Sequence, residues 1–346
     1  MNRNNSSKWS ITMVAAAVAG LCGIYPAAGA IDTFTNTNSN WDTATNWSLG
    51  AVPTATDTAE VGFISGSAST ATIKSGDNLA AGSVVLGDGN NSDRGQIFFD
   101  GGTLTVGGGT GSITTGSGTA DGWIIFQNDY NNTPSGYAAT TITATTVNVD
   151  SVFVGQGPGG GEYIIPVGQS WSGGGSLVLG NANGNLNPGL GILTINGSAS
   201  FPTVDVAVGA VNYTSDLTMS DVGILSAKTL TYGSLSSTSL AVSGFSTGQY
   251  SQIGGITGGT ATFAGTLNLN LAGVTGPGSA QVFNFSNYSG TFGTVNVAGL
   301  ASGLTASFDA ANGTVTVSSV PEPAAMGLMA AAGVGLLLVG RKRKQA

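Results

Sequence analysis

Short apolar runs recur along residues 80–247 and are separated by turns rich in glycine or asparagine. The first apolar residues of successive runs lie 40, 28, 25 and 29 positions apart. Alternation of apolar and polar residues with a period of two predicts strands, and the unequal spacing predicts solenoid coils joined by loops of variable length. The runs occupy residues 83–87, 124–126, 151–155, 176–180 and 206–209.

Second strands are expected after the turns, for example at residues 96–99 and 191–195, and no amphipathic helix stands out between residues 31 and 320. We therefore predict an all-β fold, namely a right-handed parallel β-helix or a related β-solenoid. A β-sandwich is the alternative, because short strands with frequent turns fit that fold as well.

The region between the two termini carries very little positive charge. Residues 31–320 hold Lys74, Arg94 and Lys228 against sixteen acidic residues, which gives a net charge of −13. An acidic surface disfavours nucleic acid and anionic membrane surfaces as partners. Hydrophobic residues make up 41% of the chain, more than a disordered segment would hold, so we expect a folded, β-rich body.

The N-terminus has the three parts of a secretory signal peptide. Arg3 and Lys8 precede a short apolar run, and Ala28 and Ala30 form a small-residue cleavage pattern. The short run and the cleavage pattern disfavour an N-terminal transmembrane helix. We expect residues 1–30 to engage the Sec translocon and to be removed by signal peptidase after Ala30.

The one cysteine of the chain, Cys22, lies inside this predicted signal peptide. It follows Leu21 instead of the small residue that a lipoprotein signal requires. The mature chain would therefore contain no cysteine, and packing and hydrogen bonds would stabilise it without any disulfide.

Residues 320–346 combine a proline-containing motif, an apolar span and a basic end. The two prolines fix φ and push the residues before them out of the helical region, so residues 320–323 are expected to be extended. Residues 324–340 carry no charge and would span about 25 Å as a transmembrane helix, the short end for a bilayer core. Residues 341–346 would hold that end in the cytoplasm through Arg341, Lys342, Arg343 and Lys344.

This tail resembles the PEP-CTERM protein-sorting signal, which is also catalogued as the ice-binding protein C-terminal domain. The resemblance rests on Val320, Pro321, Glu322 and Pro323, followed in order by the short apolar span and the basic end. It implies that a membrane-embedded exosortase recognises the motif, cuts there, and releases or transfers the body to the cell exterior. An ordinary single-span tail anchor is the alternative.

Two tryptophans lie six positions apart near the start of the mature region. We expect residues 31–79 to cap the first coil, with Trp41 and Trp47 stacked over its open end, because a terminal coil otherwise exposes core and strand edges. The alternative is an aromatic platform that binds a sugar.

Residues 248–319 carry longer strands and an Asn312–Gly313 pair that is typical of a hairpin turn. This segment resembles the C-terminal end of autotransporter-type passenger domains and of β-strand-repeat proteins exported by bacteria with PEP-CTERM tails. The Asn-Trp phrase at residues 40–41 resembles the start of the same proteins. The resemblance implies a β-repeat body.

Two glycine-rich segments match the sequence patterns of active sites, but the chain lacks the catalytic base or the helix that such sites require. Residues 244–248 fit G-x-S-x-G, yet Ser246 would need a base and the chain contains no histidine. Residues 155–160 fit G-x-G-x-x-G, yet a dinucleotide site needs a helix directly afterwards and residues 162–166 are typical of a strand. The body is also poor in the basic residues of a polysaccharide lyase. We expect no catalytic centre, with a polysaccharide-processing β-helix enzyme as the alternative.

Oxygen ligands alternate along one acidic turn as they do in calcium loops, at Asp88, Asn90 and Ser92, with Asp93 beside them. The turn lacks the glycine of the sixth position and the glutamate of the twelfth, and Asp and Asn favour turns in any case. A solvated turn is therefore favoured over a calcium site. Without histidine, and without cysteine after cleavage, the usual zinc ligands are missing, and we expect no cofactor.

A threonine-rich run at residues 140–146 suits a strand and would also suit an ice-binding face, but no T-x-T pattern recurs at a fixed spacing. Taken together, the sequence predicts an exported, non-catalytic protein, briefly anchored in the membrane and then placed at the cell surface or in the extracellular matrix. The expected partners are an exosortase and exopolysaccharide. A carbohydrate- or ice-binding module is the alternative.

Overall fold

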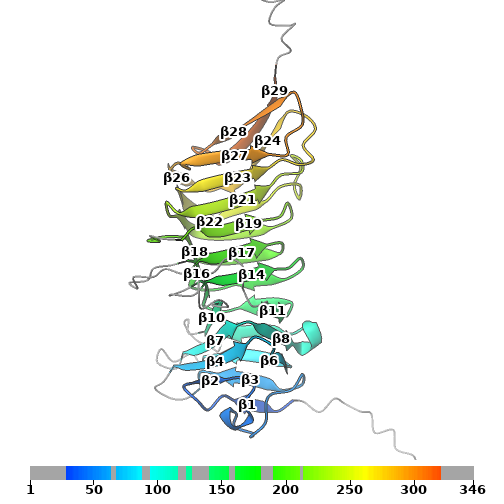
Figure 1. Cartoon of the computed structure of the whole chain (residues 1–346), viewed down its shortest axis with the longest axis vertical. Helices are drawn as coiled ribbons and strands as arrows, with labels where there is room; N and C mark the ends of the chain where they lie inside the picture. The colour runs from blue at the N-terminus through cyan, green and yellow to red at the C-terminus, as the bar shows by residue number, and fades with distance from the viewer. Residues whose placement is uncertain are drawn as a thin grey trace, which may run out of the picture.

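The computed structural model describes residues 29–63, 68–87, 94–115, 122–126, 140–155, 160–180, 190–210 and 213–320. These residues form an elongated stack of strands, a parallel β-solenoid of about eight turns that runs from β1 at one end to β29 at the other (Figure 1). The prediction of an all-β solenoid is confirmed. The alternative of a β-sandwich is wrong, because strands of successive turns pair in parallel instead of forming two packed antiparallel sheets.

The turns build three faces, which we call face A, face B and face C. The first strands of face A are β1 (Ile31–Thr33), β3 (Thr58–Val61), β6 (Ser83–Leu86), β9 (Ser112–Thr115), β12 (Thr146–Asn148) and β15 (Ser170–Ser172). The first strands of face B are β2 (Asn38–Asn40), β4 (Ser69–Lys74), β7 (Gly95–Asp100), β10 (Gly122–Phe126), β13 (Ser151–Val154) and β16 (Ser176–Leu179).

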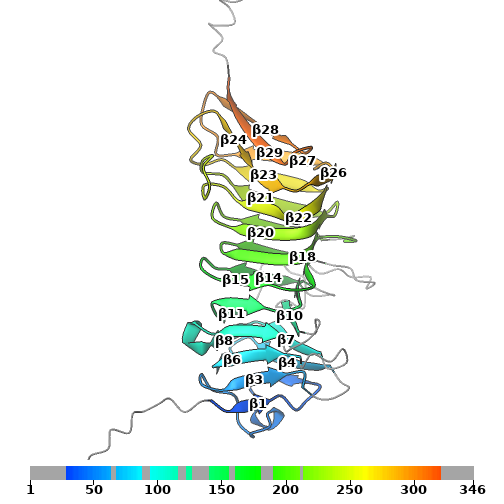
Figure 2. The same cartoon turned by 180° about the vertical axis from the view of Figure 1, so that it is seen from behind.

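Three long strands then run across both faces, because their first halves continue the ladder of face A and their second halves that of face B. These are β18 (Ser198–Val206), β20 (Ile224–Tyr232) and β22 (Gln252–Phe263), which lie toward the C-terminal end of the stack (Figure 2). The two faces finish with β25 (Phe283–Asn284) on face A and β26 (Asn287–Gly290) on face B.

Face C consists of two parallel ladders. The first holds β5 (Asn78–Ala81), β8 (Gly102–Val106) and β11 (Thr140–Thr143). The second holds β14 (Gly161–Ile165), β17 (Gly191–Ile195), β19 (Ser215–Met219), β21 (Ser236–Ala241), β23 (Thr266–Asn270) and β27 (Thr294–Ala298).

The C-terminal end of the described chain is antiparallel. Strands β28 (Leu304–Asp309) and β29 (Thr314–Ser319) form a hairpin, and β24 (Gly278–Gln281) pairs with the other edge of β29. The hairpin predicted from the Asn312–Gly313 pair is confirmed, and Gly313 has the positive φ of 67° that such a turn needs. The helices of the described residues are two short 3₁₀ turns, η1 (Ala44–Asn46) and η2 (Gly107–Gly109).

The core is a column of inward-facing side chains that stack from turn to turn. On face B, Ile97 pairs with Ile124, Ile124 with Val152, and Val152 with Leu177, in steps of 27, 28 and 25 residues. All four side chains are buried, and each contributes roughly 1.5–3 kcal/mol through removal of apolar surface from water.

This register corrects the repeat read from the sequence. The run at residues 83–87 belongs to β6 on face A, whereas the later runs lie on face B, which accounts for the first spacing of 40. In the last run, at residues 206–209, strand β18 already ends at Val206. Pairing also begins at Ile31, so residues 31–79 already contain solenoid strands, and it continues in parallel through β27 within residues 248–319.

A buried polar cluster lies where the two ladders of face C meet, between β11 and β14. The side-chain amide of Gln169 donates to the carbonyl oxygens of Ile142 and Ala144 at 3.0 and 2.9 Å. The indole N–H of Trp171 and the hydroxyl of Tyr163 donate to Oε1 of Gln169 at 2.7 and 3.2 Å. Burial raises the pKa of Tyr163 above its ordinary range.

In the described part of the chain, no helix reaches the length and apolar character that a membrane span requires.

Candidate functional site: polar ladders and a pocket on faces A and B

Face A carries two outward rows of small polar side chains on four successive turns. Their triplets are Ser112-x-Thr114, Thr146-x-Asn148, Ser170-x-Ser172 and Ser198-x-Ser200, and equivalent positions pair across the strands. None of these eight side chains is buried. Because neighbouring strands lie about 4.8 Å apart, the rows form a regular array of hydroxyl and amide groups, which we call the face A ladder.

The C-terminal half of face B carries a second array, the face B ladder. Its triplets are Thr203-x-Asp205, Thr229-x-Thr231, Thr260-x-Thr262 and Asn287-x-Ser289, again in register. The hydroxyl groups of Thr262 and Ser289 lie 2.9 Å apart and share a hydrogen bond. Asp205 is the one acidic member, and burial raises its pKa while the hydroxyl of Thr231 opposes the shift.

The middle strands of face B, from β7 to β16, are apolar at the equivalent row. Phe98, Ile125, Phe153 and Val178 follow one another in register, and Trp123 lies in the neighbouring row. The guanidinium of Arg94 lies 3.9 Å from the ring centre of Trp123, an attractive cation–π arrangement. Outward polar residues of face B therefore lie on both sides of this apolar stretch, at Thr70 and Thr72 on β4 and again in the face B ladder.

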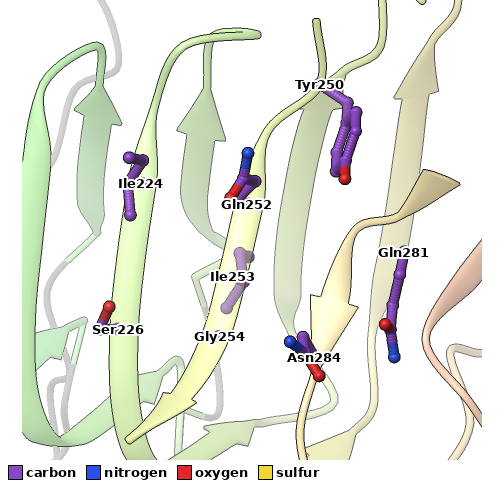
Figure 3. A pocket seen from close by; sticks show the side chains of 8 residues that line it. All are labelled: Ile224, Ser226, Tyr250, Gln252, Ile253, Gly254, Gln281 and Asn284. Atoms are coloured by element: carbon purple, nitrogen blue, oxygen red, sulfur yellow. The ribbon is translucent and has the colours of Figure 1, made fainter. Parts of the chain in front are cut away.

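A pocket of about 200 Å³ opens on the outer surface of β20, β22 and β25, next to the end of the face A ladder. Figure 3 shows Ser226 and Ile224 on β20 and Gln252 on β22, with Asn284 and Gln281 on the other side and Tyr250 above. No acidic or basic residue lines the pocket, so it offers neutral hydrogen-bonding groups and apolar surface.

The structure places Trp41 and Trp47 in the core instead of on the surface. They are 0% and 2% exposed, their ring centres lie 4.8 Å apart, and the indole N–H of Trp47 donates to the backbone oxygen of Trp41 at 2.7 Å. An aromatic platform would need a ring face open to solvent, so this interpretation is corrected. The pair packs with Phe34 inside the first turn.

The structure describes the first of the two glycine-rich motifs in full and the ends of the second, because residues 156–159 lie outside the described residues. Ser246 is on an exposed turn, where its backbone N–H donates to Oε1 of Gln249 at 3.2 Å. Strand β14 begins at Gly161, directly after the last residue of the second motif, so the predicted strand follows it and a helix does not.

The calcium candidates Asp88, Asn90, Ser92 and Asp93 lie outside the described residues. Within the ranges given above, no three side chains of the His, Cys, Asp or Glu type gather as a metal site would require. Ala30 and Val320 are the described residues nearest to the two predicted processing sites. The backbone N–H of Ala30 donates to Oδ1 of Asp57 at 3.0 Å, and that of Val320 to the backbone oxygen of Gly303 at 2.8 Å. Ala28, the motif residues after Val320 and the basic end lie outside the described residues.

Sequence reasoning missed both ladders and the pocket. The T-x-T pairs of β20 and β22 lie 31 residues apart, because a register shift between Ala227 and Thr229 adds residues to β22, whereas most turns are shorter. The threonine-rich run at residues 140–146 is in fact divided between β11 on face C and β12 on face A. Aligning triplets of the type [Ser/Thr]-x-[Ser/Thr/Asn] instead of T-x-T alone would have revealed the face A ladder.

Comparison with family models, with curated proteins and with solved structures found no match to this chain.

Proposed function

We propose that this chain is an exported, non-catalytic surface or matrix protein whose solenoid contacts extracellular polysaccharide through the face A and face B ladders. The observation that carries the proposal is the register of these ladders, which sets neutral hydroxyl and amide groups at regular intervals along the long axis. Such groups both donate and accept hydrogen bonds, as the hydroxyls of a neutral glycan do.

The sequence supports the same function. The signal peptide at residues 1–30 and the PEP-CTERM-like tail at residues 320–346 would deliver the body to the cell exterior and bring it to an exosortase. The acidic net charge disfavours nucleic acid as the ligand, and the chain lacks the histidine that a hydrolytic serine would need.

Retention by immobilised neutral polysaccharides tests the proposal. We expect the purified body to be retained, and a variant with Thr229, Thr231, Thr260 and Thr262 all replaced by valine to be retained less. Valine keeps the shape of threonine and removes only the hydroxyl, so thermal melts should show that the variant still folds. A body that no polysaccharide retains would overturn the proposal, as would the release of new reducing ends from a polysaccharide.

Ice binding is a second candidate, favoured by the T-x-T pairs at Thr229 and Thr231 and at Thr260 and Thr262. The flanking turns replace threonine by Asp205 on one side and by Asn287 and Ser289 on the other, so the threonine array is only two turns long on this face. An ice-recrystallisation assay with the same quadruple variant distinguishes this candidate, because only ice binding would change the growth of ice crystals.

A further inference from the structure

The pocket on β20, β22 and β25 exists because one position in a row of side chains is a glycine. Ser226 pairs with Gly254, and Gly254 pairs with Asn284, so these three residues occupy equivalent outward positions on neighbouring strands. A Cβ atom built on Gly254 would meet no atom within 4 Å. Gly254 is not among the residues with positive φ, so the backbone there does not require glycine. The missing side chain leaves the floor of the pocket open.

The groups around this floor are free to bind a ligand. In the described part of the chain, the side chains of Ser226, Gln252 and Asn284 form no hydrogen bond with other protein groups. Gln281 donates its amide to the backbone oxygen of Asn312 at 3.2 Å, which orients that side chain and leaves its Oε1 available. An amide can donate and accept at once, which suits pairs of adjacent hydroxyl groups.

Apolar surface completes the lining. Ile224 is 44% exposed and lies in the outward row that also holds Gln252, and Tyr250 is half-buried at the upper edge of the pocket (Figure 3). A pyranose ring presents C–H groups on its faces and hydroxyl groups around its rim, so it matches apolar side chains combined with peripheral amides. The absence of charged lining residues favours a neutral sugar over a uronic acid or an amino sugar.

The volume of the pocket limits its ligand to a single sugar unit. The pocket holds about 200 Å³, which is below the roughly 300–1,000 Å³ of sites for drug-sized molecules. We infer that this pocket binds a single neutral glycosyl unit, at the point where the face A ladder ends. The inference rests on the proposed function, because the ladders would guide the polysaccharide and the pocket would select one of its sugars.

Titration with methyl glycosides tests the inference. The wild-type body should bind a neutral methyl hexoside, taken from glucose, galactose and mannose, with a millimolar Kd by NMR, and should bind glucuronate no better. Gly254→Val fills the floor, and Asn284→Ala removes one amide; each should weaken binding about tenfold or more. Thr294→Val is the matched control, because it places the same side chain at an exposed strand position on β27 of face C, outside both ladders and the pocket, and should leave binding unchanged.

Three results would overturn the inference: no neutral methyl hexoside binds, a folded Gly254→Val protein binds as well as wild type, or glucuronate binds more tightly than the neutral sugars. Asn284→Ala changes an exposed side chain and keeps the test decisive if Gly254→Val does not fold. Retention on polysaccharide is measured separately. If polysaccharide retains the body but methyl glycosides do not bind, the inference about the pocket is refuted and the proposed function stands. If polysaccharide does not retain the body, the proposed function itself is refuted.

Discussion

A single acidic side chain interrupts the face B ladder. Asp205 occupies the row that Thr231 and Thr262 continue, and burial raises the pKa of its carboxyl group. The folded protein therefore binds this proton more tightly than the unfolded chain does. The stability that comes from protonated Asp205 is complete below the unfolded pKa of about 3.8 and is lost as the pH rises through the folded pKa.

Replacing Asp205 by asparagine should stabilise the protein at neutral pH. The amide keeps the shape of the carboxylate without its charge, so we expect a gain of about 0.5 kcal/mol at pH 7, modest because solvent screens a half-buried charge. The gain should vanish as the pH falls toward the unfolded pKa. Urea unfolding followed across this pH range provides the measurement, and a difference that does not change with pH would contradict the expectation.

Asp57→Asn serves as the control with the opposite sign. The hydroxyl and the backbone N–H of Thr54 donate to Asp57 at 2.6 and 2.8 Å and lower the pKa of its carboxyl group. The stability from this carboxylate is therefore present above its unfolded pKa and is lost as the pH falls through the folded pKa. Asp57→Asn should destabilise the protein at neutral pH and lose that effect in acid.

At the scale of residues, the exposure of a side chain was hard to predict from the sequence. That Ser246 is no catalytic nucleophile stays a prediction, which rests on the absence of histidine from the sequence. The burial of Trp41 and Trp47 could not be predicted, because a tryptophan near asparagine and threonine fits both a core plug and an exposed platform. Gly254 carried no signal in a chain with 57 glycines, since its effect depends on Ser226 and Asn284 from other turns.

At the scale of elements, the junction between β11 and β14 replaces backbone pairing with a side chain. Strand β11 pairs with β8 and strand β14 with β17, and no described ladder joins β11 to β14. Carbonyl groups at the end of the first ladder would therefore lack partners in the core. Gln169 supplies them, because its amide donates to the backbone oxygens of Ile142 and Ala144.

Gln169→Leu should weaken the solenoid at this junction. The substitution leaves the buried carbonyl of Ala144 without a donor, and the carbonyl of Ile142 keeps only the long 3.5 Å hydrogen bond from the Tyr163 hydroxyl. It also removes the acceptor for the indole N–H of Trp171, and unsatisfied buried groups cost about 1–3 kcal/mol each. Partial relaxation should bring the total loss to about 2–4 kcal/mol in urea unfolding. Gln281→Leu removes an exposed amide and should change stability by less than about 0.5 kcal/mol. Equal effects of the two substitutions would contradict this role for Gln169.

Strands were predictable from the sequence and their partners were not. The period of two marks the buried column Ile97, Ile124 and Val152 without any structure. Which strands pair depends on loop length, and for this reason the first run lies on face A although the sequence grouped it with the runs of face B. The register shift before Thr229 likewise makes the spacing of the T-x-T pairs irregular, so the sequence alone did not show that they pair. Strand type is a local property, whereas register is set by contacts about 25–30 residues apart along the chain.

At the scale of the whole molecule, both ends of the solenoid are closed by elements that differ from its turns. Trp41, Trp47 and Phe34 pack together at the N-terminal end, and the antiparallel strands β24, β28 and β29 form the C-terminal end. Closed ends protect core and strand edges from pairing with other chains, as a repeat protein requires.

The proposed sorting of this body depends on a motif directly after Val320. Prolines at positions 321 and 323 would keep the motif extended and accessible to a protease, whereas alanines would let the apolar helix begin earlier and draw the motif into it. In a host that carries an exosortase, the chain with Pro321, Glu322 and Pro323 replaced by alanine should therefore remain as a membrane-bound precursor. The wild-type chain should be shortened and leave the membrane fraction, as immunoblots of membrane and extracellular fractions would show. Val320→Ala leaves the prolines in place and should still be processed. Processing of the triple-alanine chain at the wild-type rate would refute recognition of this motif and leave an ordinary tail anchor as the explanation of residues 324–346.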